Sequence, residues 1–221
     1  MYLSRLIYEC VKNVIYLGDE GFTYESFVAG DYDNNLDYAT SINNVFTPLN
    51  KAIHRLSDRN KIKNKVVGIG MVGVNGLAEI SDYSKDIKKI TNVFSLSSNG
   101  MYFRNEFREY GRDKIVIMNP SSSSVYYMEY MQDIKHFTRD DFFKKEIADN
   151  EYEERDIDLK EYGITDTMCS YIIEFVQGHL LENIDPSLAN MHRAYAEQCF
   201  DDLETQQTSF SQRVVHKAYK I

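Results

Sequence analysis

The chain has 221 residues and a formal net charge of −9 at pH 7, from 34 acidic and 25 basic side chains. Aromatic residues make up 13% of it, which supplies enough apolar surface to offset ordering entropy and excludes a disordered chain. The acidic balance argues against nucleic-acid binding, because affinity for phosphate depends on Lys and Arg displacing counterions. No apolar run approaches the roughly 20 residues of a membrane helix. The apolar start is too short for a signal peptide, so we expect a soluble protein.

Residues 1–62 predict two amphipathic helices. Their apolar side chains recur at the spacing of one helix face. These positions are Leu3, Leu6, Ile7, Cys10, Val11, Val14 and Ile15 in the first helix, and Ile42, Val45, Phe46, Leu49, Ala52, Ile53 and Leu56 in the second. Gly18 is a plausible C-cap of the first helix. Residues 18–38 are expected to form an ordered loop, and Pro48 is expected to bend the second helix.

Residues 63–136 predict an inserted antiparallel β domain, either a small sandwich or a barrel. Asn-Gly is the strongest short hairpin signal, because both central residues of a type I′ turn need positive φ. Three hairpins are expected. They are Lys65–Val74 with Leu77–Ile80 around Asn75-Gly76, Phe94–Ser97 with Met101–Phe107 around Asn99-Gly100, and Lys114–Met118 with Val125–Met131 around residues 119–122.

The helical pattern resumes over residues 137–204 and completes a bundle. We expect a short acidic helix over 137–150, a charged connection over 150–161, and two strong helices from 166 and 186. Asp185 is placed to cap the last helix, with Pro186 at its first position. The helical pattern lapses after Glu204, so residues 205–221 are expected to form an extended arm. The predicted fold class is α+β.

No catalytic residue, cofactor or metal is predicted. His179 and His192 are the best metal candidates, but each sits on an apolar helix face without a second ligand at i+4, which favours core histidines. The glycines at 68, 70 and 73 lie in a strand pattern that no helix follows, which favours bulges over a dinucleotide loop. The serines at 121–124 have no base at a recognisable spacing.

The cysteine pattern predicts no disulfide framework. Cys10, Cys169 and Cys199 are odd in number, and each falls within an apolar helical face. Buried free thiols are favoured, because a free cysteine behaves as a small hydrophobe. We therefore expect a protein made in a reducing compartment.

Two segments are candidates for binding other proteins. Tyr126, Tyr127 and Tyr130 form a dense aromatic strand, which fits either a core face with cross-strand pairs or a protein interface. The predicted arm joins basic residues that have no local acids to scattered apolar anchors, so we expect it to dock on an acidic surface. The arm residues are Phe210, Arg213, Val214, Val215, Lys217, Tyr219, Lys220 and Ile221.

The order of elements resembles the tail-tube A (gatekeeper or adaptor) proteins of short-tailed double-stranded-DNA bacteriophages. The helix over 41–59 that leads into the strands of 65–131, and the return to helices at 166–181 and 186–203, carry the resemblance. The chain departs from short members in its longer first helix, its 18–38 loop and its charged stretch at 149–161.

The resemblance implies a virion protein of the head–tail junction, made in the host cytoplasm and assembled as a ring, of twelve copies in the family. It implies portal binding through the C-terminal arm, contact with the next tail or nozzle protein through the β insertion, and a channel that DNA passes without specific binding. The alternative is a monomeric α+β ligand-binding or regulatory domain with a pocket between bundle and sheet, and an enzyme comes third. Light scattering on the purified chain discriminates the ring from the monomer.

Overall fold

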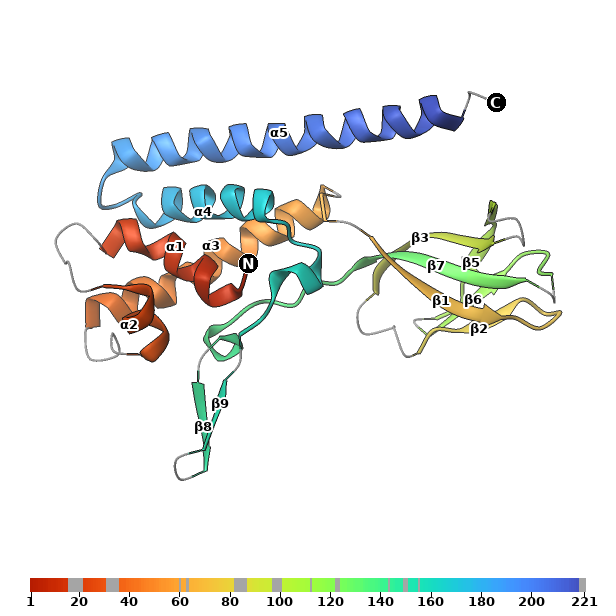
Figure 1. The fold of residues 1–221 in the computed structure, drawn as a ribbon, viewed down its shortest axis with the longest axis horizontal. Coiled ribbons are helices and arrows are strands. Elements are labelled where there is room, and N and C mark those ends of the chain that lie inside the picture. The colour runs from red at the N-terminus through yellow and green to blue at the C-terminus, as the bar shows by residue number, and fades with distance from the viewer. Residues whose placement is uncertain are drawn as a thin grey trace. The chain divides into compact units, whose positions relative to one another are not determined.

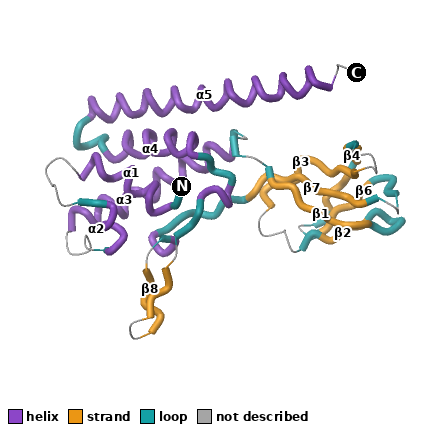
Figure 2. Tube along the Cα trace, in the orientation of Figure 1, coloured by secondary structure: helices purple, strands orange, loops and turns teal. Residues whose placement is uncertain are grey.

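The fold of this chain, seen in a computed structural model, is α+β with antiparallel sheets, as predicted (Figures 1 and 2). The structure describes residues 1–15, 22–30, 36–59, 61–62, 64–81, 87–96, 101–111, 113–121, 124–142, 144–148, 151–154 and 156–218. The chain divides into two compact units, Met1–Lys61 with His136–Ile221 and the intervening Ile62–Lys135. We call them the helical unit and the sheet unit. The insertion predicted from the sequence covers residues 63–136.

The helical unit is built from the predicted amphipathic helices. They are α1 (Leu3–Ile15), α3 (Leu36–Asp58), α4 (Asp166–Leu180) and α5 (Pro186–Ala218), and a short α2 (Tyr24–Ala29) lies where a loop was expected. Helix α1 packs on α3 and α4, and α4 packs on α5. The apolar faces predicted for α1, α3 and α4 are the buried ones, with Leu6, Leu49 and Ile172 fully buried. The face expected for α5 is wrong in part, because its Met191 and Tyr195 are exposed. Gly18, the expected C-cap of α1, lies outside the described residues.

Helix α2 is defined by local capping that hydrophobic periodicity does not report. Thr23 and Ser26 form a reciprocal capping box at its start. Gly30 ends it in the left-handed conformation, at φ 81°. These two caps explain how a six-residue helix forms inside a stretch that lacks a continuous apolar stripe.

Helix α5 begins as predicted but ends much later. The Oδ1 of Asp185 accepts hydrogen bonds from the backbone N–H groups of Ser187 (3.1 Å) and Leu188 (3.0 Å). The helix then continues to Ala218, so the prediction of an extended arm is wrong over residues 205–218. The physical reason is that no Pro or Gly occurs between residues 187 and 218. Extending an existing helix is much easier than nucleating one.

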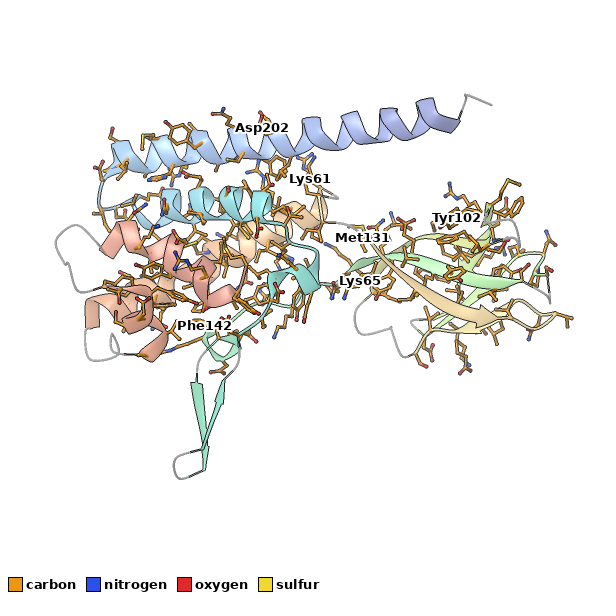
Figure 3. All side chains as sticks on the ribbon, in the orientation of Figure 1. Lys61, Lys65, Tyr102, Met131, Phe142 and Asp202 are labelled. Atoms are coloured by element: carbon orange, nitrogen blue, oxygen red, sulfur yellow. The ribbon has the colours of Figure 1, made fainter. Side chains whose placement is uncertain are left out.

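The sheet unit is a small sandwich of two antiparallel sheets. One has the order β1-β7-β3-β4 and the other β2-β6-β5. The strands are β1 (Lys65–Met71), β2 (Leu77–Glu79), β3 (Ile87–Leu96), β4 (Tyr102–Asn105), β5 (Phe107–Glu109), β6 (Lys114–Ile117) and β7 (Val125–Gln132). Both sheets contribute to one core, made of Val72, Ala78, Ile80, Ile90, Val93, Ile115, Ile117, Tyr126, Met128 and Tyr130. The first and last strands of the unit pair with each other, and Figure 3 labels Lys65 and Met131 on them.

Of the three predicted hairpins, one is confirmed. Strands β3 and β4 pair from Val93↔Asn105 to Leu96↔Tyr102, while their connection, residues 97–100, lies outside the described residues. The hairpin at Asn75-Gly76 is wrong, because β1 pairs with β7 and β2 pairs with β6. The hairpin of residues 114–131 is also wrong, because β6 and β7 belong to different sheets. Gly76 still forms a local turn at φ 70°, but that turn carries the chain from one sheet to the other.

Two of the strand glycines mark an irregularity, as the sequence predicted. The β1–β7 register shifts between Gly68 and Gly70. Gly70 has a φ of +77°, which side chains other than glycine rarely tolerate. A β-bulge therefore lies in the edge strand β1.

The helix expected over 137–150 is wrong. The segment instead forms a 3-10 turn at Arg139–Asp141 and a hairpin of β8 (Lys144–Ala148) and β9 (Glu151–Glu154). Lys144 lies opposite Glu154, and Lys145 lies opposite Glu153. Opposite charges across the strands favour this pairing. The paired residues are too far apart in the chain to form the i, i+3 or i, i+4 pairs that stabilise a helix. The hairpin extends away from the helices of its unit (Figure 1).

Candidate interaction sites

An aromatic row crosses one face of the four-stranded sheet. The rings of Tyr127 on β7 and Phe94 on β3 stack at 5.5 Å with an interplanar angle of 13°. Tyr102 on β4 meets Phe94 edge-on at 5.2 Å. On the other side, Tyr127 lies over Gly68 of β1, since a Cβ added there would be 3.8 Å from its ring. The row thus spans all four strands on a single face, which we call the outer sheet face.

The outer sheet face carries exposed apolar side chains, and the register places Glu129 and Arg104 on the same side. Tyr102 is 71% exposed and Val66 is 55% exposed, and Leu96 and Val125 are also exposed. The strand register places Val66 opposite Glu129 and Leu96 opposite Tyr102, on the same side as Tyr127. Figure 3 labels Tyr102 at this face. Several exposed apolar side chains gathered on one face are typical of protein interaction sites.

Two of the three tyrosines predicted to bind a partner are core residues. Tyr126 is 1% exposed and Tyr130 is 2% exposed, and both belong to the sandwich core. The hydroxyl of Tyr126 accepts a hydrogen bond from the backbone N–H of Ser121 at 2.7 Å. The interface prediction is therefore wrong for Tyr126 and Tyr130, because alternate residues of a strand face opposite sides of its sheet. Tyr127 alone lies on the outer sheet face.

The helical unit has a groove of about 780 Å³ between α3 and the segment 136–138. Asn50 holds this segment against the helix. Its Nδ2 donates to the carbonyl of Phe137 at 2.9 Å, and its Oδ1 accepts from the Phe137 N–H at 2.8 Å. The lining residues are Phe46, Thr47, Asn50, Lys51, His54, Arg55, Asp58, Arg59, His136, Phe137 and Thr138. A buried amide that satisfies both backbone groups of one residue gives the groove a fixed wall.

The groove is cationic in an acidic protein. Lys51, Arg55 and Arg59 follow one another at four-residue intervals along α3, and Asp58 is the one carboxylate in the described lining. The ring of His54 lies 4.6 Å from that of His136. Lys51 and Arg59 are exposed. Carboxylates or phosphates are therefore the ligands that this groove favours.

Arg55 has a structural role at the groove's edge. Its guanidinium donates two hydrogen bonds to the Glu197 carboxylate, at 2.6 and 2.7 Å, and lies 4.5 Å from the ring of Phe200. The hydrogen bond from Arg55 lowers the pKa of Glu197, and the same bond raises the pKa of Arg55. Arg55 thus fastens α3 to α5, which leaves Lys51 and Arg59 as the cations available to a ligand.

The sequence did not predict this groove. Its two walls come from residues 46–59 and 136–138, which are far apart in the chain. One signal was present in the sequence, namely a basic residue at i, i+4 and i+8 of the same helix, which places three cations on one side. The sequence around that row does not indicate which distant segment forms the other wall.

Five of the eight predicted arm residues lie within α5, and the other three, Tyr219, Lys220 and Ile221, lie outside the described residues. The five are Phe210, Arg213, Val214, Val215 and Lys217. Helix α5 has 33 residues and α4 has 15. At 1.5 Å per residue these are about 50 and 22 Å long, so α4 covers less than half of α5. The C-terminal half of α5 continues beyond the end of α4 (Figure 1).

The described residues do not form a recognisable reaction centre. They include no group of three His, Cys, Asp or Glu side chains placed to hold a metal ion. The Nδ1 of His192 lies 2.7 Å from Glu174 Oε2, and the His179 ring packs edge-on against Phe175 at 4.7 Å. Desolvation lowers the pKa of His179. Each histidine therefore has a structural partner in the helical unit.

The cysteines are free, and their environments disfavour the thiolate. Burial raises the pKa of Cys169 to about 11 and that of Cys10 well above its ordinary value. The pKa of Cys199 is also raised by desolvation. Reactive cysteines need a lowered pKa, so these three are poor nucleophiles.

Within the described part of the chain, no helix combines the length and the apolar character that crossing a lipid bilayer requires. Comparison with protein-family models and with curated proteins finds no match to this chain. Function is therefore inferred from the fold and from the three surfaces described above: the outer sheet face, the groove and the projecting half of α5.

Proposed function

We propose that this protein is a structural virion protein of a tailed bacteriophage, forming a ring that connects the portal to the tail and continues the DNA channel. One observation carries the proposal. A β-sandwich is inserted between two parts of a helical unit, and the last helix of that unit is more than twice as long as the helix it packs on. This arrangement matches the architecture that the resemblance implies, apart from the helical conformation of the arm.

Two of the three surfaces have a partner in this role. The projecting half of α5 docks on the portal, and the outer sheet face contacts the next tail or nozzle protein. Copies of the chain form the ring, twelve in number if the ring matches the family. The net charge of −9 suits a channel that repels DNA phosphates during packaging and ejection.

Co-expression with a candidate portal tests this function. We expect light scattering to show a ring-sized assembly, alone or on the portal. Removing residues 205–221 should abolish portal binding and leave the thermal transition of the remaining protein nearly unchanged. A chain that stays monomeric at all concentrations and ignores the portal overturns the proposal. A truncated chain that unfolds outright shows that this segment belongs to the core.

The basic residues of the segment 205–221 allow a finer test of portal docking. Replacing Arg213, Lys217 and Lys220 with Gln should slow association, with a loss that shrinks as salt screens the charges. Replacing Phe210 with Ala should act mainly on dissociation, because buried aromatic anchors carry much of an interface's energy. Wild-type association of the Gln variant at low salt would remove the electrostatic part of the docking proposal.

The groove supports a second candidate function, a monomeric ligand-binding domain. Its volume of about 780 Å³ falls within the range of small-molecule sites. This candidate predicts a monomer whose thermal transition rises with a small anionic ligand. The mass of the purified chain separates the two candidates in one measurement.

A further inference from the structure

We infer that the groove of one copy binds the β8–β9 hairpin of a second copy. This contact rests on the proposed function and deepens it, because it supplies the interaction between neighbours in the ring. Its chemistry is the pairing of an acidic hairpin with a cationic groove, and three features of the molecule support it.

The groove is suited to a segment that brings carboxylates. Lys51 and Arg59 are exposed on the same side of α3, two helical turns apart. The wall opposite them is held in place by the two hydrogen bonds between Asn50 and Phe137. Phe46 adds an aromatic ring to the lining. A rigid groove with two separated cations favours an extended acidic segment, because little ordering entropy is lost when it binds.

The hairpin is the candidate occupant of this groove. A single two-stranded hairpin is marginally stable in water, and this one extends away from the helices of its own unit (Figure 1). Residues 144–154 contain five acidic side chains and two lysines. The lysines lie opposite Glu153 and Glu154, whereas Glu146 lies opposite Tyr152 and Glu151 lies opposite Ala148. Within the described strands, Glu146 and Glu151 are therefore the acidic residues that do not lie opposite a lysine.

The base of the hairpin is anchored close to the groove. Phe142, labelled in Figure 3, is buried and stacks on Phe27 at 5.7 Å. It also lies 6.0 Å from the ring of Phe46, which lines the groove. Each copy thus offers an acidic hairpin and a cationic groove as separate surfaces of the helical unit. Such a contact is head-to-tail, and it closes into a ring when the rotation between copies permits.

Charge reversal in two separate chains tests the contact. The groove variant carries Lys51→Glu and Arg59→Glu, and the hairpin variant carries Glu146→Lys and Glu151→Lys. Each variant alone juxtaposes like charges, so we expect its self-association to weaken by about tenfold or more. An equimolar mixture restores both contacts in alternation, because each negative groove meets a positive hairpin and each positive groove meets a negative hairpin. Mixing should therefore recover assembly, measured by light scattering.

Matched controls separate this effect from general charge. Lys89→Glu with Arg108→Glu, and Glu106→Lys with Glu109→Lys, make the same charge changes at exposed positions of the sheet unit. Both controls should assemble as the wild type does. Thermal transitions close to that of the wild type verify that the groove and hairpin variants fold.

The outcomes also separate this inference from the proposed function. If the variants assemble like the wild type, or if mixing fails to restore assembly, the inference is wrong. If a single chain carrying all four changes recovers where the mixture does not, the hairpin docks within its own chain, which also overturns it. A wild-type chain that binds the portal without self-association removes this contact and keeps the connector role. If charge reversal abolishes self-association but the wild-type chain does not bind the portal, the contact between copies is kept and the connector role is removed.

Discussion

The two units of this protein divide stability and recognition in different ways. In the helical unit, the apolar side of α3 is buried at Leu49, Ile53 and Leu56, and the exposed row that lines the groove is basic. In the sheet unit, apolar side chains occupy both faces of the four-stranded sheet, with Tyr130 in the core and Tyr102 exposed. In helix α3, an apolar side chain therefore indicates a residue that stabilises the fold. In the sheet, apolar residues stabilise the fold on one face and are available for binding on the other.

The largest effect is expected from emptying the sheet core. Tyr130→Ala should destabilise the sheet unit by about 3–5 kcal/mol, because a fully buried aromatic side chain leaves a cavity. Hydrogen exchange followed by mass spectrometry should show the loss of protection within residues 62–135. An equal loss of protection throughout α1 and α4 would show that the two units unfold together and would weaken the comparison.

The next largest effect concerns a polar side chain in the helical unit. Asn50→Ala should cost about 3 kcal/mol, because the buried N–H and C=O of Phe137 both lose their partner. Chemical denaturation measures this, and the groove should lose its binding capacity as well. Asn44→Ala, at an exposed position of the same helix, is the control and should change stability by less than about 0.5 kcal/mol. Similar values for the two variants would contradict the role of Asn50 as a clamp.

A smaller effect is expected where α3 meets α5. Glu197→Gln should cost at most about 1 kcal/mol at neutral pH, because the Arg55–Glu197 pair is partly exposed. The pKa of Glu197 is lower in the folded than in the unfolded chain, so its contribution is present above the ordinary glutamate range and is lost as the pH falls through the folded pKa.

Stability measured against pH checks this sign. The wild type and Glu197→Gln should differ at neutral pH and converge in acid. Glu182→Gln, which removes an ion pair of 2.8 Å to Arg193, is the matched control for the loss of a partly exposed carboxylate. A difference that persists unchanged in acid would mean that the pair does not act through its charge.

The smallest change in stability is expected on the outer sheet face. Tyr102→Ser should shift the free energy of unfolding by less than about 0.5 kcal/mol, because the side chain is largely exposed. Binding of the partner proposed for this face should nevertheless weaken strongly, as measured by pull-down and calorimetry. A loss of stability comparable to that of Tyr130→Ala would show that the two faces do not differ.

Local patterns predicted the helices well. Apolar spacing identified α1, α3 and α4, and Asp185 with Pro186 located the start of α5, because helical hydrogen bonds and caps join residues close in sequence. The end of α5 was misplaced for the opposite reason. A lapse in apolar periodicity removes evidence for burial, but it does not break a helix that lacks Pro and Gly.

Strand partners and the groove depend on distant residues. Asn75-Gly76 indicates a turn, but it does not determine whether the two strands beside it pair with each other. The sequence therefore predicted that β1 pairs with β2, whereas it pairs with β7. The groove could not be predicted for the same reason, because Asn50 and Phe137 lie on either side of the sheet unit in the chain, 87 residues apart. For β7, the sequence left two interpretations open, a core face with cross-strand pairs or a protein interface. The first describes this strand, because Tyr126 and Tyr130 are in the core and Tyr127 stacks on Phe94 of the neighbouring strand.

The pairing of β1 with β7 has a consequence for how this chain can be rearranged. Lys65 lies directly opposite Tyr130, so the strands that enter and leave the sandwich are about 5 Å apart at that point. A short glycine linker can bridge such a gap with little loop-closure entropy. The two chain ends of the sandwich are therefore adjacent. This makes the sandwich suitable for removal from the chain, for expression alone, or for insertion into a surface loop of another protein.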